Sequence, residues 1–280
     1  MDAPNIFKVI DDRFSVERIE NYDLLMEVQE TRFKFLLREK ISKTVVWLED
    51  HYLGYVNSTE KLEEKLEKVF MDHEFLKANF WNSINLIIDF PCFSSIPEDF
   101  YMEESSANYL KVQYPELDFA EFEIETFKYG SEYLIFGVPQ NTITIFQNYF
   151  PNKLIGCSNS LLNSIKYFHA HERIQNKNLL ILDDNWLEAI YLEPKTGNLK
   201  TKKITLNSQY LKAFLNEIEK NGQLETLIYG EITPFSHTYR TISDKLTIIE
   251  FGGVPRNSKL SQYFAEIPEQ RYFTLFNVMF

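Results

Sequence analysis

Glycine is scarce in this chain, with 9 residues among 280, and proline is nearly as rare with 10. Loops that cradle phosphate depend on glycine, because their backbone N–H groups must approach the ligand closely. The pair Gly252–Gly253 lacks the spacing of a G-x-G-x-x-G or G-x-x-x-x-G-K pattern and indicates a turn after a strand. The composition therefore argues against a conventional nucleotide-binding loop.

Cysteine is almost absent as well. The two residues, Cys92 and Cys157, are too few for a disulfide framework, which is typical of a reducing compartment. The N-terminus has no basic region followed by an apolar stretch, so we expect no signal peptide. Apolar runs are far shorter than the roughly 18 residues that span a bilayer. We therefore predict a cytoplasmic protein without membrane insertion.

Basic residues are outnumbered. The chain has 29 Lys and Arg against 41 Asp and Glu, a net charge of −12, and its longest basic run is KTKK at Lys200–Lys203. Binding to nucleic acid relies on basic side chains that neutralise phosphates. We therefore expect no nucleic-acid partner, whereas a protein partner with a neutral or basic surface suits this charge.

Aromatic residues are abundant, with 24 Phe and 16 Tyr. They contribute to a series of predicted strands and helices that occurs twice along the chain in the same order. Each half begins with three short strands in a meander, because runs rich in β-branched and aromatic residues alternate with turn residues. Helices with a 3.6-residue apolar repeat then alternate with buried strands. In the first half we expect strands at 22–28, 33–38, 44–48, 83–89 and 133–138, with helices at 59–70, 103–112 and 139–150. A strand at 153–157 and a helix at 158–172 follow. The second half has a meander at 178–206, helices at 208–220 and 236–241, and strands at 225–229 and 245–251.

This order predicts an α/β fold with mixed sheets covered by helices. We divide the chain into a polar lead-in at 1–20, a first half at 21–152, a connecting strand and helix at 153–177, and a second half at 178–280. The histidines of the HAH sequence, His169 and His171, do not share a helix face, so we expect an exposed helix end rather than a metal site.

The segment from Gly137 to Leu206, which contains GVPQNTITIF and LLILDDNWLEAIYL, resembles actin-like pilus-assembly and secretion-platform proteins. The chain as a whole, through NYDLLMEV, LIYGEI and EIPEQRYFTLFN, is similar to a domain-of-unknown-function family of Bacteroidota. The resemblance implies an actin-like fold of two ribonuclease-H-like halves. In ATP-binding members, each half has a hairpin that grips phosphate.

The hairpins of this chain depart from that pattern. Where ATP-binding members carry Asp-x-Gly, the first hairpin has Glu27 and Gln29, and the second has Asp183 and Asn185. The resemblance also implies an adenosine-binding Gly-Gly near Gly230, where the chain has Gly-Glu. We therefore interpret all these positions as a degenerate site, in which Gln29 and Asn185 direct side chains toward the place of the phosphates.

No catalytic constellation stands out. Glu27 and Asp183 could hold Mg²⁺ between the halves, but two acidic residues left at hairpin ends explain the pattern more simply. The neighbours Asp183 and Asp184 point to opposite faces of a strand, which disfavours an acid pair. We predict no catalytic residue, no metal and no cofactor. The sequence favours a non-catalytic, actin-like protein-interaction module; the alternative is a nucleotide-binding ATPase or switch with a modified cleft. Neither the partner nor the oligomeric state follows from the sequence.

Overall fold

The computed structural model describes residues 6–56, 58–193, 197–220 and 225–278. Parts of the predicted lead-in (1–5), of the second meander (194–196) and of the C-terminus (279–280) lie outside these ranges. The chain forms two compact units. The first comprises the chain up to Leu162 and Arg256–Glu266; the second comprises Asn163–Pro255 and the segment from Ile267 on. Each unit is described separately.

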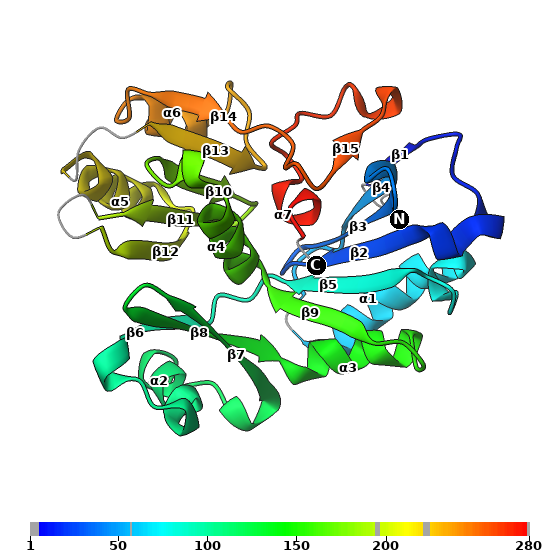
Figure 1. Cartoon of the computed structure of the whole chain (residues 1–280), viewed down its shortest axis with the longest axis horizontal. Coiled ribbons are helices and arrows are strands. Elements are labelled where there is room, and N and C mark those ends of the chain that lie inside the picture. The colour runs from blue at the N-terminus through cyan, green and yellow to red at the C-terminus, as the bar shows by residue number, and fades with distance from the viewer. Residues whose placement is uncertain (1–5, 57, 194–196, 221–224, 279–280) are drawn as a thin grey trace. The chain divides into compact units, whose positions relative to one another are not determined.

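The first unit is built on a sheet with the strand order β1-β4-β3-β2-β5-β9, to which β15 adds by pairing with β4 (Figure 1). Strands β2, β3 and β4 form the predicted antiparallel meander, and β5 and β9 then run parallel to β2. The strands are β1 (Ile6–Ile10), β2 (Tyr22–Val28), β3 (Arg32–Glu39), β4 (Thr44–Tyr52), β5 (Ser83–Ile88), β9 (Ile155–Asn159) and β15 (Lys259–Leu260).

The second unit repeats this arrangement in the order β12-β11-β10-β13-β14. Its meander is antiparallel, and β13 and β14 run parallel to its first strand, β10. The strands are β10 (Asn178–Leu182), β11 (Trp186–Leu192), β12 (Leu199–Thr205), β13 (Thr226–Gly230) and β14 (Ile249–Phe251). Both sheets therefore place the first strand of the meander between its hairpin partner and a parallel strand, as a duplicated ribonuclease-H-like fold requires.

Helices cover these sheets with the apolar faces that the sequence predicts. In α1 (Thr59–Asp72) the buried residues recur at helical spacing, and Ser58 caps the first turn by accepting a hydrogen bond from the Lys61 N–H at 3.3 Å. The ring of Phe70 stacks at 4.0 Å on Tyr149 at the end of α3 (Gln140–Tyr149). In the second unit, α5 (Ser208–Lys220) buries one apolar face in the same way. The remaining α-helices are α4 (Ser160–Ala170), α6 (His237–Ser243) and α7 (Phe273–Phe276).

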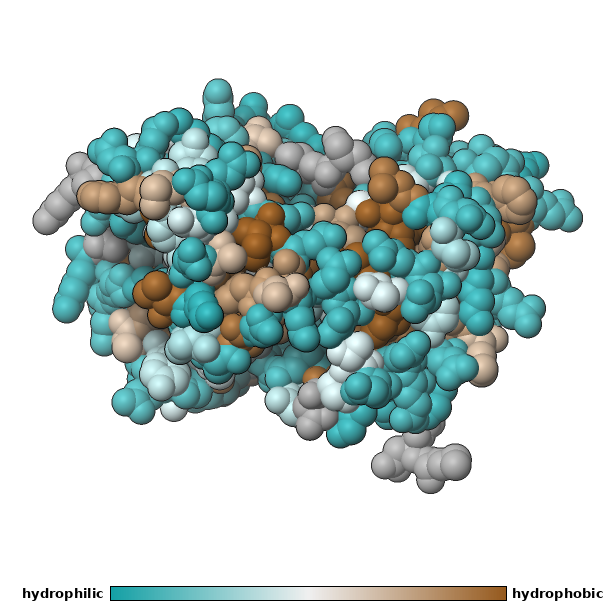
Figure 2. Space-filling model, turned by 90° about the horizontal axis from the view of Figure 1, so that it is seen from below, coloured by the Kyte–Doolittle hydropathy of each residue, from teal (hydrophilic) through white to brown (hydrophobic). Residues whose placement is uncertain are grey.

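A smaller sheet, β6-β8-β7, is inserted between β5 and α3. It packs against α2 (Ser106–Gln113) around Cys92, Leu110 and Ile135. Figure 2 shows hydrophobic patches among hydrophilic residues on one face of the molecule. The strands are β6 (Phe93–Pro97), β7 (Phe122–Tyr129) and β8 (Glu132–Pro139). The sequence indicated only β8, because β6 and β7 are largely half-buried or exposed strands with mixed composition, whereas most of β8 is buried.

Three expectations need correction. The polar lead-in, in which no strand was expected, contains β1, which pairs with β4. Strand β1 is mostly exposed and has a lysine at its centre, so it lacks the continuous buried apolar run of strands such as β10. Strand β9, placed in the connection, is an edge strand of the first sheet and pairs with β5. The strand predicted at 245–251 is confined to Ile249–Phe251. Among the described helices, none combines the length and apolar character needed to span a bilayer.

A buried charge cluster lies between β1, β4 and the end of α1. The carboxylate of Glu49, which is fully buried, accepts hydrogen bonds from Trp47 Nε1 (2.9 Å), His51 Nε2 (2.8 Å), His73 Nε2 (3.0 Å) and Lys8 Nζ (2.7 Å). Burial acts to raise the pKa of Glu49, but these hydrogen bonds outweigh it and hold the pKa well below its usual range. The same contact with Glu49 raises the pKa of His73.

This cluster predicts a pH dependence of stability. Because the pKa of His73 is raised in the folded state, its contribution is complete below the ordinary value of 6.5 and is lost as the pH rises through the folded pKa. We expect the melting temperature to fall as the pH rises above the ordinary histidine value of 6.5, and His73→Gln to flatten that part of the profile. His169→Gln, at the exposed end of α4, is the control and should keep the wild-type slope. An unchanged slope in His73→Gln would contradict this assignment.

Candidate functional site

The first hairpin, between β2 and β3, holds its acidic residue internally. The side chain of Glu27 is almost completely buried, at 2% exposure. Its carboxylate accepts a hydrogen bond from Gln29 Nε2 at 3.1 Å and lies 3.9 Å from the ammonium of Lys34, which is equally buried. Gln29, at the position where the resemblance implies a glycine, therefore turns its amide back onto Glu27.

The rest of this hairpin is fixed by the segment that follows β4. The Thr31 carbonyl accepts a hydrogen bond from the Leu53 N–H at 2.8 Å, and the Glu30 carbonyl accepts one from the Val56 N–H at 3.0 Å. The N–H of Gln29 is itself used in the hairpin, where it donates to the Arg32 carbonyl at 2.9 Å. A ligand would have to break this pattern to reach the Gln29 N–H.

The second hairpin, between β10 and β11, is closed by the carboxylate of Asp183. Its Oδ1 accepts hydrogen bonds from the N–H groups of Asn185, at 2.7 Å, and Trp186, at 2.6 Å. The Asp183 N–H in turn donates to the Trp186 carbonyl at 3.0 Å. An anionic oxygen of the protein thus occupies the backbone donors of this turn, which is the role a phosphate oxygen has in an anion-binding loop.

Neither hairpin uses a conformation that demands glycine. Among the described residues that are not glycine, only Lys43 has a positive φ, at 59°. Gln29 and Asn185 thus adopt ordinary backbone conformations, and their turns satisfy the buried polar groups with side chains. The two carboxylates predicted as possible metal ligands lie in different units, Glu27 in the first and Asp183 in the second, and each is hydrogen-bonded within its own hairpin. The described residues form no group of three or more acidic, histidine or cysteine side chains suited to a metal ion.

Gly230, the position expected near an adenosine, is a glycine for a structural reason. Its φ is +94°, and a Cβ there would lie 1.8 Å from the carbonyl oxygen of Leu182 at the end of β10. The Gly230 N–H donates to the Gln270 carbonyl at 2.8 Å, and the next N–H, of Glu231, donates to the Leu182 carbonyl at 2.7 Å. Close packing of β13 on β10 therefore accounts for this glycine without a ligand.

Aromatic rings fill the region beside Gly230. Tyr229 lies over Gly252, where a Cβ would come within 2.0 Å of the ring. Its ring is 4.1 Å from that of Phe273, and its hydroxyl is 3.4 Å from that of Tyr167. Burial raises the pKa of Tyr229. These contacts make the end of β13 a packed part of the core of the second unit.

Sequence reasoning missed polar residues at the carboxyl ends of β5 and β9. Ser160 donates a hydrogen bond from Oγ to Asp89 Oδ1 at 2.7 Å, and Asn159 donates from Nδ2 to the Phe90 carbonyl at 2.9 Å. Asp89 directly follows β5, Asn159 ends β9 and Ser160 follows it. Because the carboxyl ends of parallel strands meet at one edge of a sheet, the sequence could have pointed to these residues. Asp89 thereby lies at the same edge as the first hairpin, with its carboxylate bound to a serine.

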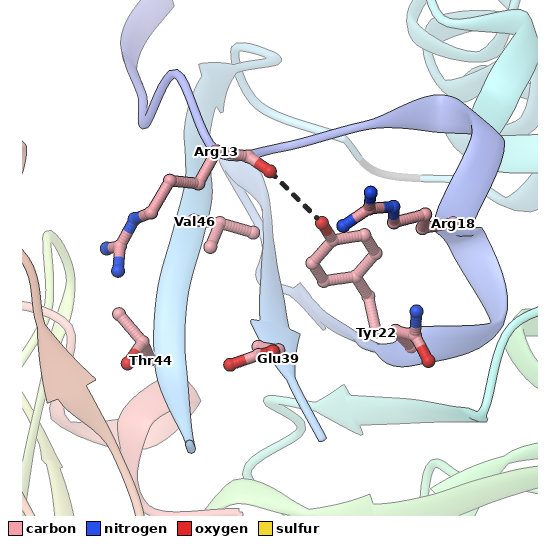
Figure 3. Close-up of a pocket in the computed structure, with 7 residues that line it drawn as sticks. Arg13, Arg18, Tyr22, Glu39, Thr44 and Val46 are labelled. Atoms are coloured by element: carbon pink, nitrogen blue, oxygen red, sulfur yellow. Dashed lines mark hydrogen bonds between the residues drawn. The ribbon is translucent and has the colours of Figure 1, made fainter. Parts of the chain in front are cut away.

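A surface pocket of about 400 Å³ lies at the opposite end of β2, near Tyr22 (Figure 3). The Tyr22 hydroxyl donates to the Arg13 carbonyl at 3.4 Å. The Arg13 guanidinium donates to Asp11 at 2.9 Å, which keeps the pKa of that carboxyl well below its usual range. The charge of Arg13 is compensated by Asp11, and the other charged lining residues are one basic, Arg18, and one acidic, Glu39, so the lining does not favour an anion. Its lining residues are Arg13, Arg18, Asn21, Tyr22, Glu39, Thr44 and Val46.

The histidines predicted at a helix end lie at the end of α4. His169 is exposed, and His171 places Nδ1 at 2.8 Å from the Tyr167 carbonyl. The exposure of His169 and the contact of His171 both suit a helix terminus.

We predict that the close approach at Gly230 is essential for stability. Gly230→Ala should lower the free energy of unfolding by about 3 kcal/mol or more, because the new Cβ would overlap Leu182 and the backbone is left-handed. Gly130→Ala is the matched control: its φ is also positive, at +57°, but no atom lies within 4 Å of the added Cβ. Gly130→Ala should lower the free energy of unfolding, measured by urea denaturation, by only about 1 kcal/mol. Equal losses would contradict the packing argument.

A second prediction concerns the closed hairpin. Asp183→Ala removes the acceptor of two backbone N–H groups and should lower the free energy of unfolding by about 1–3 kcal/mol. Asp184→Ala, at the exposed neighbouring position, should change it by less than about 0.5 kcal/mol. Chemical denaturation of both variants measures the difference, and a neutral Asp183→Ala would show that the carboxylate does not hold the turn.

Comparison with known proteins identifies the fold. A structure from Bacteroides thetaiotaomicron, described as a protein with an actin-like ATPase fold and unknown function, aligns with a TM-score of 0.68 at 16% identity. That alignment covers 85% of this chain and 93% of the other. A PilM–PilN type IV pilus biogenesis complex aligns with a TM-score of 0.55 at 8% identity, covering 91% and 96% of the two chains.

These likenesses confirm the actin-like fold predicted from the sequence. No curated protein shows significant sequence similarity to the chain. The sequence pattern of one family, described as "Protein of unknown function (DUF3822)", matches residues 11–196, which is more than half of the chain. The chain therefore belongs to the DUF3822 family of proteins with an actin-like fold.

Proposed function

We propose that this protein is a non-catalytic, actin-like scaffold that binds a protein partner. The observation that carries the proposal is the second hairpin, in which the Asp183 carboxylate accepts hydrogen bonds from the Asn185 and Trp186 N–H groups. A phosphate would have to displace a negatively charged group of the protein from these donors. It would also be repelled by that group if the carboxylate stayed close.

The first hairpin supports the same proposal by a different route. The two basic residues that follow its turn are already engaged: Arg32 lies 3.0 Å from Asp50 and Lys34 lies 3.9 Å from Glu27. Gln29 satisfies the other carboxylate oxygen of Glu27. Binding of phosphate here would leave a buried carboxylate without its cation, which costs several kcal/mol. In both hairpins, groups of the protein itself satisfy the polar atoms that a phosphate would contact. This favours loss of nucleotide binding over a site that binds nucleotide with different residues.

A protein partner fits the exposed aromatic residues. Phe100, Phe235 and Tyr55 are each more than half exposed, and aromatic side chains are the usual anchors of protein interfaces. The structural neighbour PilM was solved in a complex with PilN. We extend only the general feature, binding to another protein, from that neighbour to this chain.

The proposal predicts that the wild-type protein neither binds nor hydrolyses ATP. Isothermal titration with ATP and Mg²⁺ should give no saturable heat at millimolar nucleotide, and phosphate release should equal that of a Glu27→Ala/Asp183→Ala control. The melting temperature should not rise with ATP and Mg²⁺, because only a ligand of the folded state stabilises it. Micromolar binding or turnover that Asp183→Ala abolishes would favour the alternative, a nucleotide-dependent switch.

Restoring glycine tests whether side chains alone block the site. Gln29→Gly with Asn185→Gly should remove side-chain bulk but should not create tight binding, since the Asp183 carboxylate still occupies the donors and each lost charge-assisted bond is worth only about 1.5–3 kcal/mol. The same titration measures this variant. Tight binding after the two changes would mean that bulk, rather than the occupied donors, excludes the nucleotide.

A further inference from the structure

Strand β1 is an edge strand with unusual composition for that position. It pairs with β4 on one side, and no described strand pairs with its other side (Figure 1). Ile6 is 40% exposed, and Phe7 and Ile10 are each 37% exposed. Long apolar side chains on an open edge invite pairing with another strand, and proteins usually avoid them there.

The hydrogen-bond pattern shows which backbone groups face outward. The Asp11 N–H donates to the Val46 carbonyl at 2.8 Å, directly after the register pair Ile10 and Trp47. In an antiparallel ladder, hydrogen-bonded and non-hydrogen-bonded pairs alternate. The N–H and C=O groups of Ile6, Lys8 and Ile10 therefore point away from β4, where they can pair with a second strand.

The sequence of β1 is symmetric about Lys8 in its pattern of residue types. It reads Ile-Phe-Lys-Val-Ile, so an antiparallel copy centred on Lys8 places Ile6 opposite Ile10 and Phe7 opposite Val9. Every flanking pair is then apolar with apolar. The outward groups of Ile6, Lys8 and Ile10 also meet one another in this register, as hydrogen-bonded pairs require.

The central Lys8 does not oppose this pairing, although lysine often protects an edge. Its ammonium lies 2.7 Å from the carboxylate of Glu49 and 4.6 Å from the ring centre of Trp47. The charge is therefore bent back onto its own sheet and neutralised there. Beyond the strand, Asp11 is neutralised by Arg13. Within β1 the single charge is therefore compensated by the protein's own sheet, so antiparallel pairing does not place two uncompensated ammonium groups opposite each other.

We propose that β1 is a homodimer interface, in which two copies join their first-unit sheets by antiparallel β1–β1 pairing about a two-fold axis at Lys8. Five-residue strands bury less surface than the roughly 1,200–2,000 Å² of a stable interface, so the dimer is a weak one with a micromolar dissociation constant. It is closed, because the pairing uses the edge of both copies. This inference is independent of the proposed loss of nucleotide binding.

Sedimentation equilibrium of the full chain tests the proposal. The mean mass should rise from that of one chain to that of two as the protein concentration increases from about 1 to 200 µM. A dissociation constant in this range is expected for so small an interface. Ile10→Lys should raise the dissociation constant at least tenfold. Ile41→Lys, the same change at an 88% exposed isoleucine in the β3–β4 turn, should leave it unchanged. A wild-type monomer at all concentrations, or a dimer that tolerates Ile10→Lys, would overturn the proposal.

Cross-linking tests the register without adding charge. Phe7 and Val9 of opposite copies form a non-hydrogen-bonded pair, whose Cα separation of about 4.5 Å suits a disulfide. Under mild oxidation, a mixture of the single variants Phe7→Cys and Val9→Cys should give a covalent dimer. Either variant alone should give much less, which also controls for Cys92 and Cys157. Equal cross-linking in the mixture and in the single variants would refute this register.

Discussion

Parallel pairing with the first strand of a meander is the constraint on which both units depend. Once β5 runs beside β2, and β13 beside β10, the carboxyl ends of these strands must meet at one edge of each sheet. Each hairpin leaves from that same edge. The fold thus creates two places where backbone donors, strand ends and helix starts converge, whether or not a ligand uses them.

The groups that occupy the backbone donors at these two sheet edges decide whether a phosphate can bind there. An actin-like ATPase leaves the donors of its hairpins to phosphate, whereas here each turn is completed from within. Asp183 does this with a carboxylate on backbone N–H groups, and Glu27 does it with Gln29 and the buried Lys34. Gly230 fits the same description, because it permits β13 to approach Leu182 and needs no nucleotide to explain it. A site that satisfies its own polar groups gains stability and loses the open donors that binding requires.

The duplicated order of strands and helices could be predicted from the sequence, since the meanders and the α1 and α5 faces have strong periods. The two hairpins could be located too, whereas the interpretation of Gln29 and Asn185 as replacements of glycine stays a prediction. Strand β1 could not be found, since it is mostly exposed with a lysine at its centre and its pairing with β4 is a long-range contact. The same holds for the ring of Tyr229 over Gly252 and for Asp89 with Ser160, which depend on how distant strands meet. Local sequence patterns thus predict helices and strands. The contacts within a site depend on side chains that the topology brings together from distant parts of the chain.

The backbone amides of Asn185 and Trp186 offer the most direct test of a hairpin closed by its own carboxylate. Their proton and nitrogen resonances can be followed by NMR as ATP with Mg²⁺, or inorganic phosphate, is added. If Asp183 holds both donors, the two resonances stay in place up to millimolar ligand, and Asp183→Ala shifts them strongly. A saturable shift of these amides in the wild-type protein on adding either ligand would contradict the closed hairpin and restore the nucleotide site.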